Sequence, residues 1–146
     1  MTDVPRVFTL EEANALVPRL NALVALQMDR RANIERGLER LGALVGAVPD
    51  AIEVQDGDAP EVCDVKRDLL ARIEEYQSAW HEIEELGAVL KDARIGLLDF
   101  YGDVDGRRVW LCWKYGEPAV GHYHGLNEGF SGRKRIEPLM RHRHLN

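Results

Sequence analysis

Residues 97–114 read LLDFYGDVDGRRVWLCWK, and this stretch predicts a β-hairpin. Aliphatic and aromatic side chains fill both of its ends, and Asp105-Gly106 between them is a strong signal for a two-residue turn. If Val104 pairs with Arg107 across that turn, the register of the whole hairpin follows. One face is then apolar and should pack on the rest of the protein, with the cross-strand pairs Leu98–Trp113, Phe100–Leu111 and Gly102–Val109.

The other face of this hairpin carries candidate metal ligands. Asp99 lies opposite Cys112 in the same register, and His122 and His124 follow as a His-x-His pair in a possible third strand, 119–124. Alternate residues of a strand project to one side, so both imidazoles can reach one ion. An Asp/Cys/His/His set suits zinc or ferrous iron by ligand type. The alternative is a pair of ordinary hydrogen-bonding histidines beside a buried cysteine.

Two long helices are expected before the hairpin. Thr9-Leu10-Glu11-Glu12 reads as a capping box, which marks a helix start. Apolar residues then recur at steps of three and four, with a polar break at Gln27 and with Pro18 inside the pattern, where we expect a kink. Residues 49–60 contain two prolines and lack helical period, so they predict a connection. A second stripe predicts a helix over roughly 61–93.

These helices also predict a partner. Each apolar stripe is narrow, and two antiparallel helices alone leave much apolar surface uncovered. A homodimer that forms a coiled-coil-like four-helix bundle would cover it. The alternative is that the C-terminal part folds back over the helices. The leading hypothesis is therefore a non-enzymatic interaction protein that dimerises through its helices.

Length, charge and cysteine content exclude several classes of protein. The 146 residues predict one α+β domain, mainly α: a helical hairpin at 9–93, a β-hairpin and Gly/His-rich segment at 96–133, and a basic tail at 134–146. A net charge of −6 argues against a general nucleic-acid binder, except through the tail. No membrane span or signal peptide is evident, and two cysteines without a CxxC motif favour the cytoplasm.

Five segments together resemble a small bacterial family of unknown function, some of whose members are labelled cell-division or division-initiation proteins. In order along the chain these are FTLEEANALVPRL (8–20), EIEELGAVLKD (82–92), GLLDF (96–100), VWLCWKYGEP (109–118) and YHGLNEGFSGR (123–133). The resemblance covers nearly the whole chain. It implies a helical hairpin followed by a small β-element, and it implies no established activity, substrate or cofactor.

Polar residues within the resembling segments suggest a small-ligand site as an alternative function. Glu117, His124 and Arg133 would gather around the hairpin, where Glu117 and His124 could take part in acid–base chemistry. No nucleophile has a recognisable motif, since Ser131 lacks a G-x-S-x-G context. We therefore predict no catalytic residue and lean against an enzyme.

Overall fold

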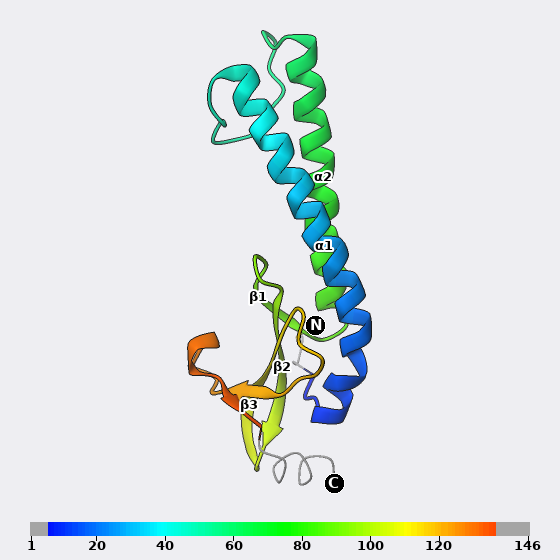
Figure 1. Cartoon of the computed structure of the whole chain (residues 1–146), viewed down its shortest axis with the longest axis vertical. Coiled ribbons are helices and arrows are strands. Elements are labelled where there is room, and N and C mark those ends of the chain that lie inside the picture. Colours follow the sequence, from blue (N-terminus) through cyan, green and yellow to red (C-terminus); the bar gives the residue numbers. More distant parts are fainter. Residues whose placement is uncertain (1–5, 137–146) are drawn as a thin grey trace, which may run out of the picture. The chain divides into compact units, whose positions relative to one another are not determined.

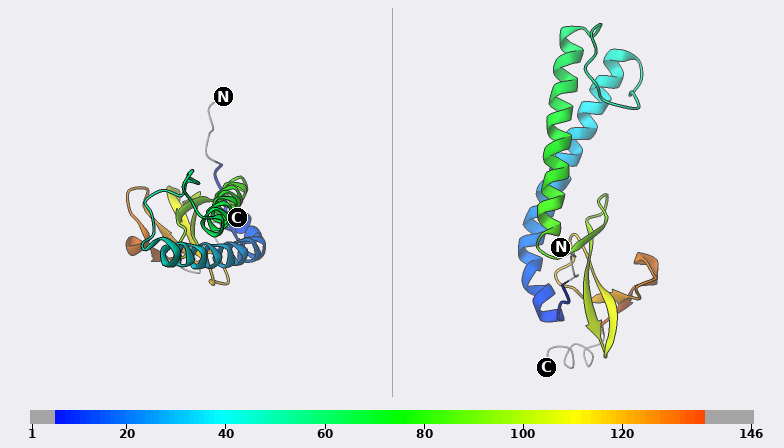
Figure 2. Two further views of the ribbon diagram at one scale, coloured as in Figure 1. Left: turned by 90° about the horizontal axis from the view of Figure 1, so that it is seen from above. Right: turned by 180° about the vertical axis from the view of Figure 1, so that it is seen from behind.

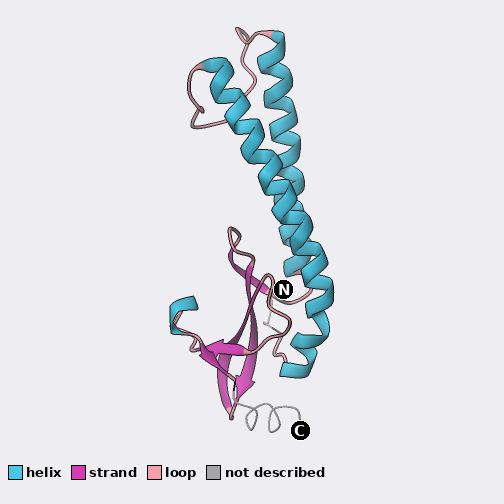
Figure 3. Ribbon diagram, viewed as in Figure 1, coloured by secondary structure: helices cyan, strands magenta, loops and turns pink. Residues whose placement is uncertain are grey.

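The computed structural model describes residues 6–136, in which two helices precede a five-stranded antiparallel sheet of order β1-β2-β3-β4-β5 (Figures 1 and 3). The predicted α+β class is confirmed. The elements are α1 (Leu10–Val45), α2 (Pro60–Glu84), β1 (Val89–Asp92), β2 (Leu97–Val104), β3 (Arg107–Lys114), β4 (His122–His124), the 3₁₀ turn η1 (Phe130–Gly132) and β5 (Lys134–Arg135).

Internal contacts divide the chain into two compact units. The sheet unit joins the N-terminal segment, up to Ala25, with residues from Glu82 onward. The hairpin unit spans Leu26–His81. The organisation as one domain stays a prediction, and each unit is described by itself.

The β2–β3 hairpin has the register that the sequence predicts. Val104 pairs with Arg107, and the pairing continues without a slip to Leu97 and Lys114. Asp105 and Gly106 have φ of 54° and 80°, as both central residues of a type I′ turn require. This turn matches the twist of the two long strands (Figure 2, right) and so fixes which side chains share a face.

The apolar face of the hairpin forms the core of the sheet unit. Phe100 and Leu111 are completely buried, and Phe8 packs edge-to-face on Phe100 with ring centroids 5.0 Å apart. The Phe8 amide donates to the Tyr101 carbonyl at 2.7 Å, which ties the start of the chain to β2. The first turns of α1 complete this core with the buried residues Leu10, Ala13, Val17, Leu20 and Val24.

The capping box at the start of α1 is confirmed. The Thr9 hydroxyl accepts from the Glu12 amide at 3.0 Å, and the Glu12 carboxylate accepts from the Thr9 amide at 2.8 Å. Both bonds satisfy amides that the helix itself leaves without partners. Pro18 lies inside α1, and the kink expected there stays a prediction.

The predicted end of the second helix at 93 is wrong, because α2 ends at Glu84. The Gly87 amide donates to the Glu84 carbonyl at 2.9 Å, and Gly87 has φ of 110°, which is typical of a helix stop. Residues 89–92 instead form β1, where Val89 pairs with Asp99. Leu90 fits the helical period, but the free edge of β2 offers its backbone a strand partner.

Two further strands complete the sheet at its other edge. The possible third strand of the sequence is present as β4, which pairs with β3. Lys134–Arg135, which we expected to open the basic tail, pair with β4 as β5. The rest of the tail, from residue 137, lies outside the described residues, so its contact with nucleic acid stays a prediction.

The hairpin unit has its own small core. Leu41 of α1 and Leu69 of α2 are fully buried there beside Val62 and Val65. Gln27, at the polar break of the first stripe, is also fully buried, and its amide donates to the Tyr76 carbonyl at 2.9 Å. A buried polar group thus finds a partner on the other helix.

Within residues 6–136, neither helix combines the length and the apolar composition that crossing a bilayer requires.

A substitution at Gly102 tests the packing of the N-terminal segment on the sheet. A Cβ there would lie 2.7 Å from the Phe8 carbonyl oxygen and 2.7 Å from Leu111 Cδ1. Because a backbone oxygen cannot move aside cheaply, Gly102→Ala should lower the free energy of unfolding by about 1–3 kcal/mol in urea titrations. Gly57→Ala, whose Cβ would meet nothing within 4 Å, is the control. Equal midpoints for the two variants would contradict this packing.

Candidate functional site

Three of the four predicted metal ligands lie together on the face of the sheet that does not carry Phe100 and Leu111. Asp99 on β2 pairs with Cys112 on β3, and His124 reaches them from β4. One ligand atom from each residue lies within 4.8 Å of the other two. All three side chains are buried, at 0%, 0% and 2% exposure. The cluster therefore places a carboxylate, a thiol and an imidazole around one point, away from water.

The hydrogen bonds of His124 determine where its protons lie. Nδ1 is 3.0 Å from the Gly125 carbonyl oxygen, which only accepts, so Nδ1 carries a hydrogen. Nε2 is 2.7 Å from Asp99 Oδ2, and a proton must lie between those two atoms. Burial raises the pKa of Asp99. The neighbouring His124 acts in the opposite direction, because it favours the charged form of the Asp99 carboxyl group. The pair thus shares one proton, while Asp99 Oδ1 has no hydrogen-bond partner among the described residues.

The environment of Cys112 keeps its thiol protonated. Burial, followed by the nearby Asp99 carboxylate, raises the pKa of Cys112 to about 12, although Arg133 acts in the opposite direction. His124 cannot take the thiol proton, because both of its ring nitrogens already bind other groups. The three residue types of a Cys/His/Asp triad are therefore present without the geometry that activates the nucleophile.

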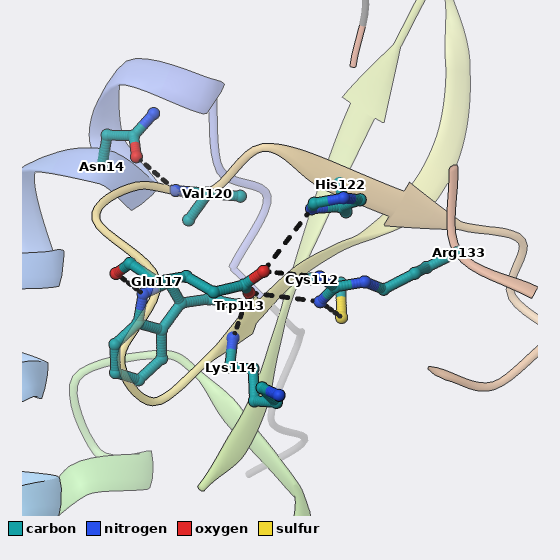
Figure 4. Close-up of polar contacts among 8 residues, drawn as sticks. All are labelled: Asn14, Cys112, Trp113, Lys114, Glu117, Val120, His122 and Arg133. Atoms are coloured by element: carbon teal, nitrogen blue, oxygen red, sulfur yellow. Dashed lines mark hydrogen bonds and ion pairs between the residues drawn. The ribbon is translucent and has the colours of Figure 1, made fainter. Parts of the chain in front are cut away.

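Glu117 and Arg133, predicted as ligand-binding residues, pair with each other beside this cluster (Figure 4). The Arg133 guanidinium donates to both carboxylate oxygens, at 3.1 and 2.5 Å, and its Nη1 lies 3.6 Å from Cys112 Sγ. Burial alone would raise the pKa of Glu117, but Arg133 and the Lys114 amide hold it below its usual value. Cys112 therefore has the Asp99–His124 pair and the Glu117–Arg133 pair as neighbours.

The two histidines of the His-x-His pair have different partners. His122 Nδ1 lies 3.7 Å from the Glu117 carboxylate, and His122 is not part of the three-residue cluster. His124, expected in both the metal set and the ligand set, lies with Asp99. The alternation of a strand places both side chains on one face, but neighbours on that face decide where each imidazole turns.

The contacts that fix the loop between β3 and β4 were not foreseen from the sequence. Asn14 Oδ1, from α1, accepts from the Val120 amide at 2.7 Å, and the Trp113 indole donates to the Glu117 carbonyl at 3.0 Å (Figure 4). Asn14 and Val120 are 106 positions apart, so no local pattern links them. The Phe130 ring, 4.7 Å from Arg133 Cζ, is another contact without a sequence signal.

The two cysteines should differ strongly in reactivity. Cys112 is fully buried, and with a pKa of about 12 only about one thiol in 10⁴ is ionised at pH 8, whereas Cys63 is partly exposed. Iodoacetamide at pH 8 should therefore modify Cys63 in the native protein and Cys112 only after unfolding, as mass spectrometry of peptides can show. Similar rates at the two cysteines in the native state would refute the burial of Cys112.

Comparison with known proteins identifies a family. The model of DUF2203, described as an uncharacterized conserved protein, matches residues 6–136, and the chain therefore belongs to this family. The expected membership of a family of unknown function is confirmed, whereas the cell-division label gains no support from this match. Neither the curated proteins nor the solved structures give a match.

Proposed function

We propose that this protein binds one metal ion, zinc in the first place, through Asp99, Cys112 and His124. The observation that carries the proposal is the convergence of three buried side chains of different ligand type within 4.8 Å. Carboxylate oxygen, thiolate sulfur and imidazole nitrogen are all zinc ligands. Ferrous iron is the second metal that this set suits.

The surroundings of the ligands support a metal site. His124 donates its Nδ1 hydrogen to the Gly125 carbonyl, so Nε2 is the nitrogen that points at the cluster. Histidines that bind metals usually make such a second hydrogen bond, which fixes the ring. Asp99 Oδ1 is buried without a hydrogen-bond partner among the described residues, and a cation would compensate it. Binding would replace the proton shared by Asp99 and His124 and the thiol proton of Cys112.

Three protein ligands leave a coordination position for a further group. Structural zinc sites normally have four protein ligands, whereas sites that bind substrates or water have three. The site thus supports a metal-dependent ligand-binding function, which was the alternative hypothesis from the sequence. Two free cysteines are consistent with the reducing cytoplasm in which we propose that it acts.

Metal loading of protein without a histidine tag tests this proposal. Elemental analysis after incubation with zinc and dialysis should give about one ion per chain, and cobalt should produce the charge-transfer absorption of a thiolate ligand. Cys112→Ser should abolish that absorption, while Cys63→Ser, the matched control, should retain it. Absence of stoichiometric metal, or equal loss in both variants, would exclude the site.

A second proposed property is self-association through the helices. The hairpin unit has an open apolar groove of about 300 Å³, lined in part by Ile34, Leu38 and Ile73. Leu70, one turn before Ile73, is 42% exposed. Arg31 and Glu35, which form an ion pair with each other at 3.1 Å, also line the groove, and a second copy related by a two-fold axis would bring the same pair to the interface. This proposal keeps the interaction role that the apolar stripes predict.

Light scattering at micromolar concentration tests this association. Wild-type protein should have the mass of a dimer, and Leu70→Glu should give a monomer because it introduces a charge beside the groove. Leu126→Glu changes a leucine of similar exposure, 44%, in the sheet unit and should leave the dimer intact. A monomeric wild-type protein would refute dimerisation through the helices.

A further inference from the structure

We propose that Arg133 binds an oxyanion, a carboxylate or phosphate group, that also occupies the open position of the metal ion. This inference rests on the proposed metal site and names the chemistry of the ligand that completes it. Its basis is the position of one guanidinium beside the thiol ligand of the cluster.

Arg133 is close enough to the cluster to share a ligand with the ion. Its Nη1 lies 3.6 Å from Cys112 Sγ, and a zinc–thiolate bond is about 2.3 Å long, so the ion would lie at most about 6 Å from Nη1. A carboxylate or phosphate has several oxygens. One of them can bind the ion while another accepts from the guanidinium.

The guanidinium is held in place before any ligand arrives. Glu117 accepts from both Nη atoms, and the Phe130 ring lies 4.7 Å from Cζ. The Arg133 side chain is only 15% exposed. Nη1 donates to Glu117 at 3.1 Å and lies 3.6 Å from Cys112 Sγ, so its hydrogen on the cysteine side can also reach an oxygen that binds beside the sulfur. Such preorganisation lowers the entropic cost of binding.

The residues around Arg133 favour an anionic ligand with an apolar part. Lys114 Nζ lies 5.9 Å from the centre of the Phe130 ring, so two cations lie beside this ring. Phe130 is 40% exposed and offers apolar contact at the surface. Glu117 is the carboxylate that contacts Arg133. It already accepts hydrogen bonds from the Arg133 guanidinium and the Lys114 amide, which offset its negative charge. If Arg133 had only a structural role, substituting it would lower the stability of the fold and leave anion binding unchanged.

Cobalt spectroscopy of the untagged full chain separates these roles. The visible bands of bound cobalt change when its fourth ligand changes, so inorganic phosphate or acetate should produce a saturable shift, and chloride at equal ionic strength is the control. The two titrations show which oxyanion is preferred. Arg133→Lys keeps the charge but loses the planar fork and should weaken anion binding roughly 10- to 100-fold. Arg133→Met should remove the response.

Arg135→Met is the matched control. The Arg135 side chain is exposed on β5, and no described side-chain hydrogen bond or ion pair joins it to the metal ligands or to the Glu117–Arg133 pair. It should respond as the wild type does. Retention of the thiolate band in the Arg133 variants shows that their site is intact. Failure of cobalt to bind overturns the metal site and this inference together. Cobalt binding with no response to either anion, or a full response in Arg133→Met, overturns this inference alone.

Discussion

The turn at Asp105-Gly106 determines the rest of the sheet unit. Both residues have positive φ. The two-residue turn that they form pairs Val104 with Arg107 and so fixes the register of β2 and β3 along all eight residues of each strand. That register puts Phe100 into the core and Asp99 beside Cys112. A slip by one residue would exchange the two faces and separate these two groups. The chemistry of the site thus depends on backbone geometry at the far end of the hairpin.

Local signals explain what the sequence could predict of the fold. The capping box at Thr9 and the Asp-Gly turn each act within a few residues, and both are present as expected. Helical periodicity predicts the wrong end for α2, because Leu90 continues the period and the period carries no information about the edge of β2 with which this segment pairs. The sequence also gives no signal for the strand pairing of Lys134, since a glycine-rich loop without a regular pattern separates it from its partner Tyr123.

The candidate site was predictable to the extent that it follows from the register. Asp99 and Cys112 are direct cross-strand partners, and strand alternation brought His124 to their face. Glu117 and Arg133 were suggested only by resemblance, and their pairing depends on loops whose course the sequence does not specify. The same holds for His122, whose contact with Glu117 follows from a loop anchored by Asn14.

The sheet unit is built from segments on both sides of the hairpin unit in the sequence, and this affects the order in which the protein can form during synthesis. Phe8 donates to Tyr101, whereas β5 at Lys134 closes the far edge of the sheet. The hairpin unit, Leu26–His81, has its own core, and it is fully translated before the strands of the sheet unit. Arg133 follows the hairpin unit and strands β1–β4 in the sequence, so it is translated after them. A prematurely terminated chain would therefore contain the helical hairpin and lack the complete site.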